Sequence, residues 1–360
     1  MKALSLSRPS CSQSQIREMI SSELGCVTPV IVIPGHYEDK ELAHAARIIT
    51  FVKKANGGSN CASANAIILP QDWDQKEAFR KSLIQEFERG FDHPAYYPGA
   101  REKRDALMKH YLSLGEDRAT VVEGKKSIGI KRNSGDCVVL LECGTPSKDN
   151  FDGTALTQEA FCPALAVVEL QSQKHNTEEY MENAVVPFLN NKENIYGSLS
   201  CMIISPKSVS DDVIMLEKTI SLLQYGTVAI NSPTLFGYEV AMAGGTWGGH
   251  HQEFKHESGY GCIGNLYGIK EQPMKNVMKG PPLLQIPILD PALIPPAIVM
   301  DGMHVVKSST TTIQAVLSVI QILTVRGIIM VLHPIARLVK ADSILSSFAS
   351  SWGKSLNRKE

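Results

Sequence analysis

Short runs of apolar, mostly β-branched residues alternate along this chain with longer amphipathic segments, and this alternation constrains the fold more than any other feature. The runs have the length and the residue types of buried strands. We expect strands at 29–34, 66–70, 137–141, 164–170, 199–205 and 226–231, and helices at 37–54, 72–90 and 208–224. Strands that alternate with helices of this length predict an α/β fold with a mainly parallel sheet flanked by helices.

Composition and charge exclude several classes of protein. The 360 residues carry a net charge of −1, so there is no basic field that would make nucleic acid an expected partner. Eight cysteines in a chain of this length are too few for the disulfide framework of a small secreted protein, and no secretory leader with an apolar core is present. We therefore expect reduced thiols and a cytoplasmic location, with one thiol available for catalysis.

The two ends of the chain differ in composition from its middle. Residues 1–22 begin with a serine-rich stretch that faintly resembles an organelle-targeting peptide, and we favour a disordered leader over a targeting signal. The part at 271–360 is rich in proline and then strongly apolar. Its segment 313–332 has the length of a membrane span, but it contains two glutamines and Arg326. We favour a buried or oligomer-forming element over membrane contact, and we place the main domain at 23–270.

Two sequence patterns suggest sites that we do not adopt. The sequence GYGCIG at 259–264 fits a dinucleotide-binding fingerprint, but it follows a polar stretch where such a fingerprint needs a buried strand. His250, His251 and His256 suggest a metal site, yet adjacent histidines rarely reach one ion and no carboxylate has the helical spacing of a ligand. We expect a solvated loop and no metal.

Cys61 follows the glycine-rich sequence NGGSN at 56–60, which ends the first expected helix. A thiol in such a turn lies near backbone N–H groups, which lower its pKa and can hold an oxyanion. The alternative is a structural cysteine, because a free cysteine often behaves as a small buried apolar side chain. The turn alone leaves both interpretations open.

Four blocks of sequence resemble the aldehyde dehydrogenase superfamily, in the order that the family has them. The sequence ELG at 23–25 is followed by a strand, a helix and NGGSNC at 56–61, which fits the family's N-x-G-x-x-C through Asn56, Gly58 and Cys61. Further on, EAFCP at 159–163 fits E-x-F-G-P, with a cysteine in place of the usual glycine. YGTVAIN at 225–231 and the glycine-rich block at 246–261 complete the series.

The resemblance implies an aldehyde-dehydrogenase-like catalytic domain and a role for each matched residue. Cys61 would attack an aldehyde as a thiolate, with its own N–H holding the oxyanion, and hydride transfer to NAD or NADP would leave a thioester. Glu23 would activate the water that releases the acid. Glu159 would bind the ribose hydroxyls next to the nicotinamide, and Phe161 would pack near the nicotinamide.

Asn56, Gly58 and Asn231 are implied as structural members of the motifs. One departure from the family is the short segment before the E-L-G motif, where only 22 residues stand in this chain. We expect the chain to lack most of the N-terminal dinucleotide-binding domain, and we expect the 360 residues alone not to bind NAD(P) measurably.

Three functions stay open at this point. The first is an aldehyde dehydrogenase that acts on an aldehyde with NAD or NADP, as a homo-oligomer or together with a full-length homologue. The second is an acyl-thioester reductase of the same superfamily, which runs the hydride step in reverse and needs no water-activating base. The third is a truncated homologue without catalysis that acts through protein–protein contacts.

Overall fold

The computed structural model describes residues 22–125, 133–171, 176–210, 212–237, 246–250, 258–260, 263–264 and 275–280. The strands are β1 (Ser22–Glu23), β2 (Thr28–Val32), β3 (Ala64–Pro70), β4 (Ala119–Val122), β5 (Val138–Gly144), β6 (Ala164–Leu170), β7 (Ser200–Ile204), β8 (Thr227–Ile230), β9 (Thr246–Trp247), β10 (Gly259–Tyr260), β11 (Ile263–Gly264) and β12 (Asn276–Lys279). The helices are α3 (Asp39–Lys54), α4 (Lys76–Arg89), α5 (Ala100–Leu114), α6 (Thr177–Tyr180), α7 (Val186–Asn190), α8 (Lys207–Ser210) and α9 (Val213–Leu222). Shorter helical turns are η1 (Ala55–Gly58), η2 (Glu116–Arg118), η3 (Ser134–Asp136), η4 (Thr154–Leu156) and η5 (Met181–Val185).

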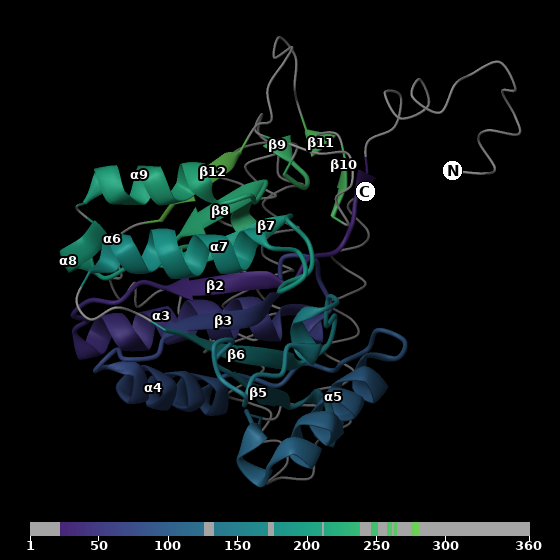
Figure 1. The fold of residues 1–360 in the computed structure, drawn as a ribbon. Coiled ribbons are helices and arrows are strands. Elements are labelled where there is room, and N and C mark those ends of the chain that lie inside the picture. Colours follow the sequence, from purple (N-terminus) through teal and green to yellow (C-terminus); the bar gives the residue numbers. More distant parts are fainter. Residues whose placement is uncertain are drawn as a thin grey trace, which may run out of the picture. The chain divides into compact units, whose positions relative to one another are not determined.

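Eight strands form one sheet in the order β12-β8-β7-β2-β3-β6-β5-β4 (Figure 1). All neighbours in this sheet are parallel except β4, which runs antiparallel to β5 at the edge. From β2 the chain forms the neighbouring β3, continues to β4 at the far edge, and returns inward through β5 to β6, which lies beside β3. It then crosses to the other side of β2 with β7 and β8. The expected α/β class with a mainly parallel sheet is confirmed.

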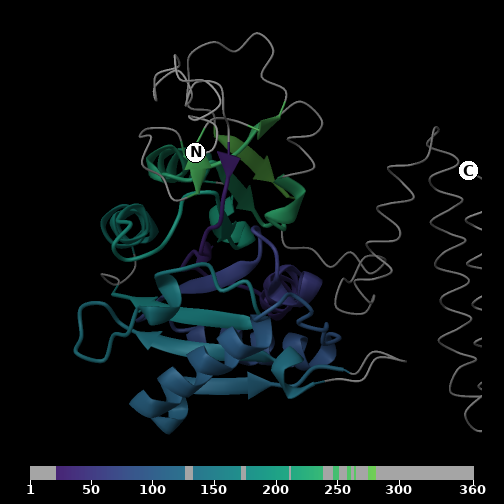
Figure 2. The same cartoon turned by 90° about the vertical axis from the view of Figure 1, so that its right-hand side faces the viewer.

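Helices cover both faces of this sheet, because its strands are buried on both sides. On one face, apolar residues of α5, α7 and α9 pack with every second strand residue, among them Ile68 of β3 and Ile203 of β7. The strand alternation turns Ile67 and Leu69 to the opposite face, where α3 and α4 pack against each other and against the sheet. In Figure 2 the purple helix α3 and the teal helices lie on opposite sides of the strands.

Most expected elements are present, and the differences have local causes. The helix expected at 208–224 is wrong as a single element: it is split into α8 and α9. The Asp212 side chain accepts a hydrogen bond from the Met215 N–H at 3.1 Å and so begins a new helix. The sequence patterns also missed α5, β4 and β12. Strand β12 lies within 271–360, and it pairs in parallel with β8 from Asn276 to Lys279.

Of the expected leader 1–22, residues 1–21 lie outside the described residues, whereas Ser22 belongs to the paired strand β1. The apolar segment 313–332 also lies outside them, so the expectations for both stretches stay predictions. Within the part of the chain that the structure describes, no helix is long and apolar enough to cross a membrane.

Candidate active site

Three matched residues stand just before three neighbouring parallel strands. Glu23 precedes β2, Cys61 precedes β3, and Glu159 precedes β6. Because β2 pairs with β3 and β3 pairs with β6, their amino ends meet at one edge of the sheet. Figure 2 views the molecule from the side on which the purple segment enters β2. The parallel sheet therefore brings the two acids and the thiol together at its amino edge.

The glycine-rich turn η1 has a backbone that only glycine and a few other residues adopt. Asn56, Gly57 and Gly58 all have positive φ, at 54°, 60° and 76°. A Cβ on Gly58 would lie 2.4 Å from the Cys162 carbonyl oxygen. The Ser59 hydroxyl donates a hydrogen bond to the Phe161 carbonyl oxygen at 3.1 Å. The turn before the cysteine is therefore packed directly on the segment between Glu159 and β6.

This packing predicts that Gly58→Ala lowers the free energy of unfolding by about 2–4 kcal/mol, because it combines backbone strain with a steric clash. Gly99 is a matched control. It has a φ of 81°, and a Cβ there would meet nothing within 4 Å. Gly99→Ala should therefore be destabilised by backbone strain alone, which lowers its free energy of unfolding by about 1 kcal/mol. Urea unfolding of both variants compares the two, and equal losses would contradict the close approach of Gly58 to Cys162.

Side-chain hydroxyl groups fix the backbone around Cys61. The Thr28 hydroxyl donates to the Cys61 carbonyl oxygen at 3.3 Å, and the Thr234 hydroxyl donates to the Ala62 carbonyl oxygen at 2.7 Å. Thr28 also shares a hydrogen bond of 2.9 Å with Ser200 of β7. The turn is thus held from two different strands. Its thiol is half-buried, whereas the five other cysteines among the described residues are buried.

The environment raises the pKa of the Cys61 thiol far above its ordinary value. Burial is the largest cause, and the charge of Glu23 and a hydrogen bond from the thiol to its carboxylate come next. Glu159 adds a smaller effect of the same sign. Our expectation that the turn lowers this pKa is wrong for this state, because burial and the two carboxylates outweigh the backbone hydrogen bond. Cys61 therefore rests as a neutral thiol near Glu23.

Glu23 is held in place by the block near residue 260. Strand β1 pairs antiparallel with β10, so that Glu23 stands opposite Gly259. The Leu24 N–H donates to the Ser258 carbonyl oxygen at 2.9 Å, and the Ser258 hydroxyl donates to the Gly25 carbonyl oxygen at 2.8 Å. The fourth block of the resemblance thus positions the carboxylate of the first. The described parts of GYGCIG lie in short antiparallel strands, which agrees with our exclusion of a dinucleotide fingerprint.

The Glu159 carboxylate lies against the backbone of the E-L-G motif. Its Oε1 atom accepts a hydrogen bond from the Cys26 N–H at 3.4 Å. A Cβ on Gly25 would lie 2.4 Å from its Oε2 atom, so a glycine is needed for this approach. The pKa of Glu159 is raised to about 7: burial is the largest cause and the charge of Glu23 acts in the same direction, whereas the Cys26 N–H and the charges of Lys103 and Lys53 act in the opposite direction.

Aromatic side chains flank the same edge. Phe161 has a φ of 50°, and its ring meets the Tyr97 ring edge-on with centroids 4.8 Å apart. Tyr97 is half-exposed. Phe161 thus presents a ring beside the Glu159 carboxylate, in the geometry that a planar ligand could stack against.

The buried Asn231 joins the carboxyl ends of β7 and β8. Its side chain accepts from the Ser205 N–H at 2.8 Å and donates to the Ser205 carbonyl oxygen at 2.9 Å. With a φ of 49°, it turns the chain after β8 toward Thr234, which bonds the Ala62 carbonyl oxygen. Its contacts support the cysteine turn and do not include the two acids.

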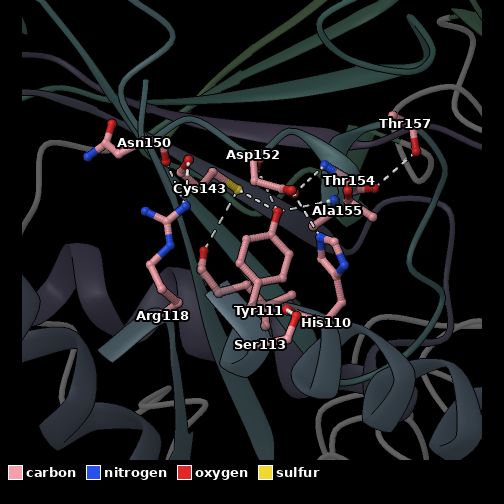
Figure 3. Close-up of polar contacts among 11 residues, drawn as sticks. His110, Tyr111, Ser113, Arg118, Cys143, Asn150, Asp152, Thr154, Ala155 and Thr157 are labelled. Atoms are coloured by element: carbon pink, nitrogen blue, oxygen red, sulfur yellow. Dashed lines mark hydrogen bonds and ion pairs between the residues drawn. The ribbon is translucent and has the colours of Figure 1, made fainter. Parts of the chain in front are cut away.

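A buried network, shown in Figure 3, anchors the loop that carries Glu159. The Tyr111 hydroxyl of α5 donates to the Asp152 carbonyl oxygen at 2.8 Å and accepts from the Ala155 N–H at 3.3 Å. The Cys143 thiol lies 3.3 Å from the same hydroxyl. The His110 ring is paired with the Asp152 carboxylate at 3.0 Å. The helix α5, which the sequence patterns missed, therefore fixes the loop before Glu159.

One further residue beside the site, Lys53, was also missed. Lys53 is fully buried near the end of α3, and it donates a hydrogen bond to the Asn65 side-chain oxygen at 3.0 Å. The signal was present in the sequence, because Lys53 continues the spacing of Leu42, Ala46 and Ile49 on the buried face of the helix. A lysine on that face is unusual and points to a special environment.

No group of three or more histidine, cysteine or acidic side chains in the described ranges is arranged to hold a metal ion. Of the three histidines, only His250 belongs to those ranges. The loop expectation for His251 and His256 therefore stays a prediction.

Solved aldehyde dehydrogenases are similar to this chain. The salicylaldehyde dehydrogenase of Pseudomonas putida G7, complexed with salicylaldehyde, is 19% identical over 70% of this chain and 46% of its own, with a TM-score of 0.49. The NADP-dependent glyceraldehyde-3-phosphate dehydrogenase of Bacillus halodurans C-125, complexed with NADP, is 19% identical over 67% and 44%, with a TM-score of 0.47. The betaine aldehyde dehydrogenase of Staphylococcus aureus, complexed with NAD+, is 19% identical over 69% and 44%, with a TM-score of 0.47. No family model and no curated protein matches, and the chain spans less than half the length of each of these three structures.

Proposed function

We propose that this chain carries the catalytic half of an aldehyde dehydrogenase, which oxidises an aldehyde to a carboxylic acid through a thioester on Cys61. The observation that carries the proposal is the position of Glu23, Cys61 and Glu159 just before the neighbouring parallel strands β2, β3 and β6, where the charges of both carboxylates raise the pKa of the Cys61 thiol. A thiol beside a base is the arrangement of an activated nucleophile. The four sequence blocks support the same assignment.

The proposed chemistry assigns each side chain one task. Glu23 takes the proton of Cys61 as the sulfur attacks the aldehyde carbon, and the Cys61 N–H stabilises the oxygen that becomes negative. Glu23 then gives this proton to solvent. After oxidation, Glu23 takes a proton from the water that attacks the thioester, and this proton passes to the Cys61 sulfur as the acid leaves. Because Glu23 stands beside the sulfur, water has a base available, which favours the dehydrogenase over the acyl-thioester reductase.

The residues at the edge fit the nicotinamide end of NAD or NADP. A bound nicotinamide nucleotide would supply the hydride acceptor. The Glu159 carboxylate offers two acceptor oxygens for a pair of ribose hydroxyls, and Phe161 offers a ring against which a planar group packs. Glu159 accepts both hydroxyls only in its ionised form, so binding of the ribose should strengthen as the pH rises through about 7.

A first test uses aldehyde protection of the thiol. We expect millimolar propanal or benzaldehyde to slow the alkylation of Cys61 by iodoacetamide reversibly, because a thiohemiacetal ties up the sulfur. Propanol and benzyl alcohol are the controls and should have no effect. Peptide mass spectrometry reads the modification at each cysteine. Absence of protection, or equal protection by the alcohols, would contradict the proposed reaction.

A second prediction concerns Glu23→Gln. The carboxylate raises the pKa of Cys61 by its charge and by its hydrogen bond, so the amide should increase the thiolate fraction. We expect alkylation of Cys61 at pH 7 to speed up by about tenfold, the effect of about one pKa unit. Thioester hydrolysis should fall, since the base for water is gone.

The two effects of Glu23→Gln have opposite signs, which separates chemistry from damage to the fold. Glu38→Gln is the control, because Glu38 lies before α3 and pairs with Lys40 instead of a thiol. It should leave the alkylation rate unchanged. Slower alkylation in Glu23→Gln would show that the carboxylate assists the thiol in a way that its charge does not explain.

A further inference from the structure

Lys53 is a buried cation that has no negatively charged partner in the described part of the chain. Its side chain is fully buried, and its Nζ atom donates to the Asn65 Oδ1 atom at 3.0 Å and to the Ser63 Oγ atom at 3.4 Å. Both acceptors are neutral. Among the residues that the structure describes, no carboxylate lies within ion-pair distance of Lys53.

The next residue shows what a structural lysine looks like here. Lys54 is also buried, and it forms an ion pair of 2.9 Å with Asp92. It also donates to the Phe87 and Gly90 carbonyl oxygens at 2.6 and 3.1 Å. A buried cation is stabilised by such partners and is costly without them. Since the fold supplies Lys54 with a carboxylate and not Lys53, stability alone does not account for Lys53, and perturbed buried groups beside a cleft are candidates for function.

A line of hydrogen bonds connects Lys53 to Glu159. The Asn65 Nδ2 atom donates to the Cys26 carbonyl oxygen at 3.2 Å. The N–H of the same Cys26 donates to the Glu159 Oε1 atom at 3.4 Å. Asn65 therefore joins the ammonium to Cys26, the residue whose N–H faces the carboxylate. Because Ser63 and Asn65 stand two and four residues after Cys61, the same contacts also hold the start of β3 against the end of α3.

The charges around these groups come from several elements. Lys53 and Lys103 of α5 both lower the pKa of Glu159, and Glu23 raises it. Burial lowers the pKa of Lys53 to about 8, while the nearby Cys162 and Glu159 raise it. At neutral pH the ammonium is thus mainly charged and acts on Glu159 from inside the protein, where water screens it little.

We infer that Lys53 is a positioning residue that favours the ionised form of Glu159, by placing the Cys26 N–H through Asn65 and by supplying a buried positive charge. The inference rests on the proposed function, in which Glu159 must be ionised to accept two ribose hydroxyls. Its ligand class is therefore a cis-diol of a nucleotide ribose. Lys53 touches neither the ligand nor the sulfur.

Titration of Glu159 tests the inference on the chain itself. Glutamate labelled with ¹³C at the side-chain carboxyl is followed by NMR between pH 4 and 10, and Glu159→Gln assigns the signal. In Lys53→Met, we expect the titration midpoint of Glu159 to rise by about one pH unit. The control Lys81→Met removes an exposed lysine of α4 and should leave the midpoint unchanged.

Asn65→Asp provides a second arm that keeps Lys53 in place. The new carboxylate would form an ion pair with the ammonium, so it cancels the charge that acts on Glu159, and the midpoint should again rise. Lys53→Met removes the ammonium, whereas Asn65→Asp keeps it and pairs it with a carboxylate. Both variants should raise the titration midpoint of Glu159. A purely structural role of Lys53 would change stability and leave the midpoint where it is.

The outcomes separate this inference from the proposed function. An unchanged midpoint in both variants, or in Asn65→Asp alone if Lys53→Met does not fold, overturns the role of Lys53. The aldehyde protection of Cys61 is measured in the unmodified chain and does not depend on Lys53. If aldehyde protects Cys61 but the variants do not shift the titration midpoint of Glu159, only the role of Lys53 is rejected. If the midpoint shifts but aldehyde does not protect Cys61, only the proposed aldehyde reaction is rejected.

Discussion

At pH 7, iodoacetamide should modify Cys61 at least about a hundredfold faster than each of the five other cysteines that the structure describes. Those five side chains are at most 1% exposed, so reagent reaches them only when the surrounding structure opens, and opening of a core costs several kcal/mol. Cys61 is half-exposed and needs no such opening. Peptide mass spectrometry after brief labelling gives the rate for each cysteine.

The pH dependence of this reaction is a second part of the same expectation. Because burial and two carboxylates raise the pKa of Cys61, its thiolate fraction should keep growing from pH 7 to pH 10 without a plateau. Cys11 and Cys262 lie outside the described residues and are followed separately, since Cys11 in the leader is a natural rival. Labelling of Cys137 or Cys201 before Cys61 would contradict the assignment of the nucleophile.

The strands could be predicted because each one is a continuous apolar run, and the rules of parallel sheets then place their amino ends together. The assignment of Glu23, Cys61 and Glu159 to one site comes from the resemblance of their motifs, and the parallel pairing of β2, β3 and β6 explains how the fold places them near one another. Helix α5 could not be predicted in the same way. It buries Arg104 together with Leu107 and Tyr111, so its polar sequence hides its buried face.

The sign of the Cys61 pKa shift shows the limit of local arguments. The turn before Cys61 suggests backbone N–H groups that favour a thiolate, and this depends only on neighbours in sequence. The opposing effect comes from Glu23 and Glu159, which are distant in sequence and act through space. Whether the backbone N–H groups or the carboxylates have the larger effect on the pKa of Cys61 depends on burial and on distances. The sequence motif determines neither of these.

The adjacent lysines of α3 should respond to the same substitution in different ways. Lys54→Met leaves the Asp92 carboxylate buried without its cation, so we expect the free energy of unfolding to fall by about 3–5 kcal/mol. Lys53→Met removes a cation that has no carboxylate partner and leaves only neutral oxygens behind. We expect its stability at pH 7 to stay within about 1 kcal/mol of the original chain or to increase.

The pH dependence of stability distinguishes the two lysines further. The pKa of Lys53 is about 8 in the folded chain and is higher in the unfolded chain, where a lysine has its ordinary value of 10.5. Below pH 8 both states hold the proton, and the folded state carries the full cost of the buried charge. As the pH rises from 8 toward 10.5, the unfolded chain holds more protons than the folded chain, so folding becomes more favourable, by about 3 kcal/mol in total.

Urea unfolding at intervals from pH 7 to 10.5 should show this rise as a difference between the original chain and Lys53→Met, because other titrating groups are common to both. A constant difference over that range would mean that Lys53 keeps its proton in the folded chain, and that the buried site stabilises the charge far better than its neutral partners suggest.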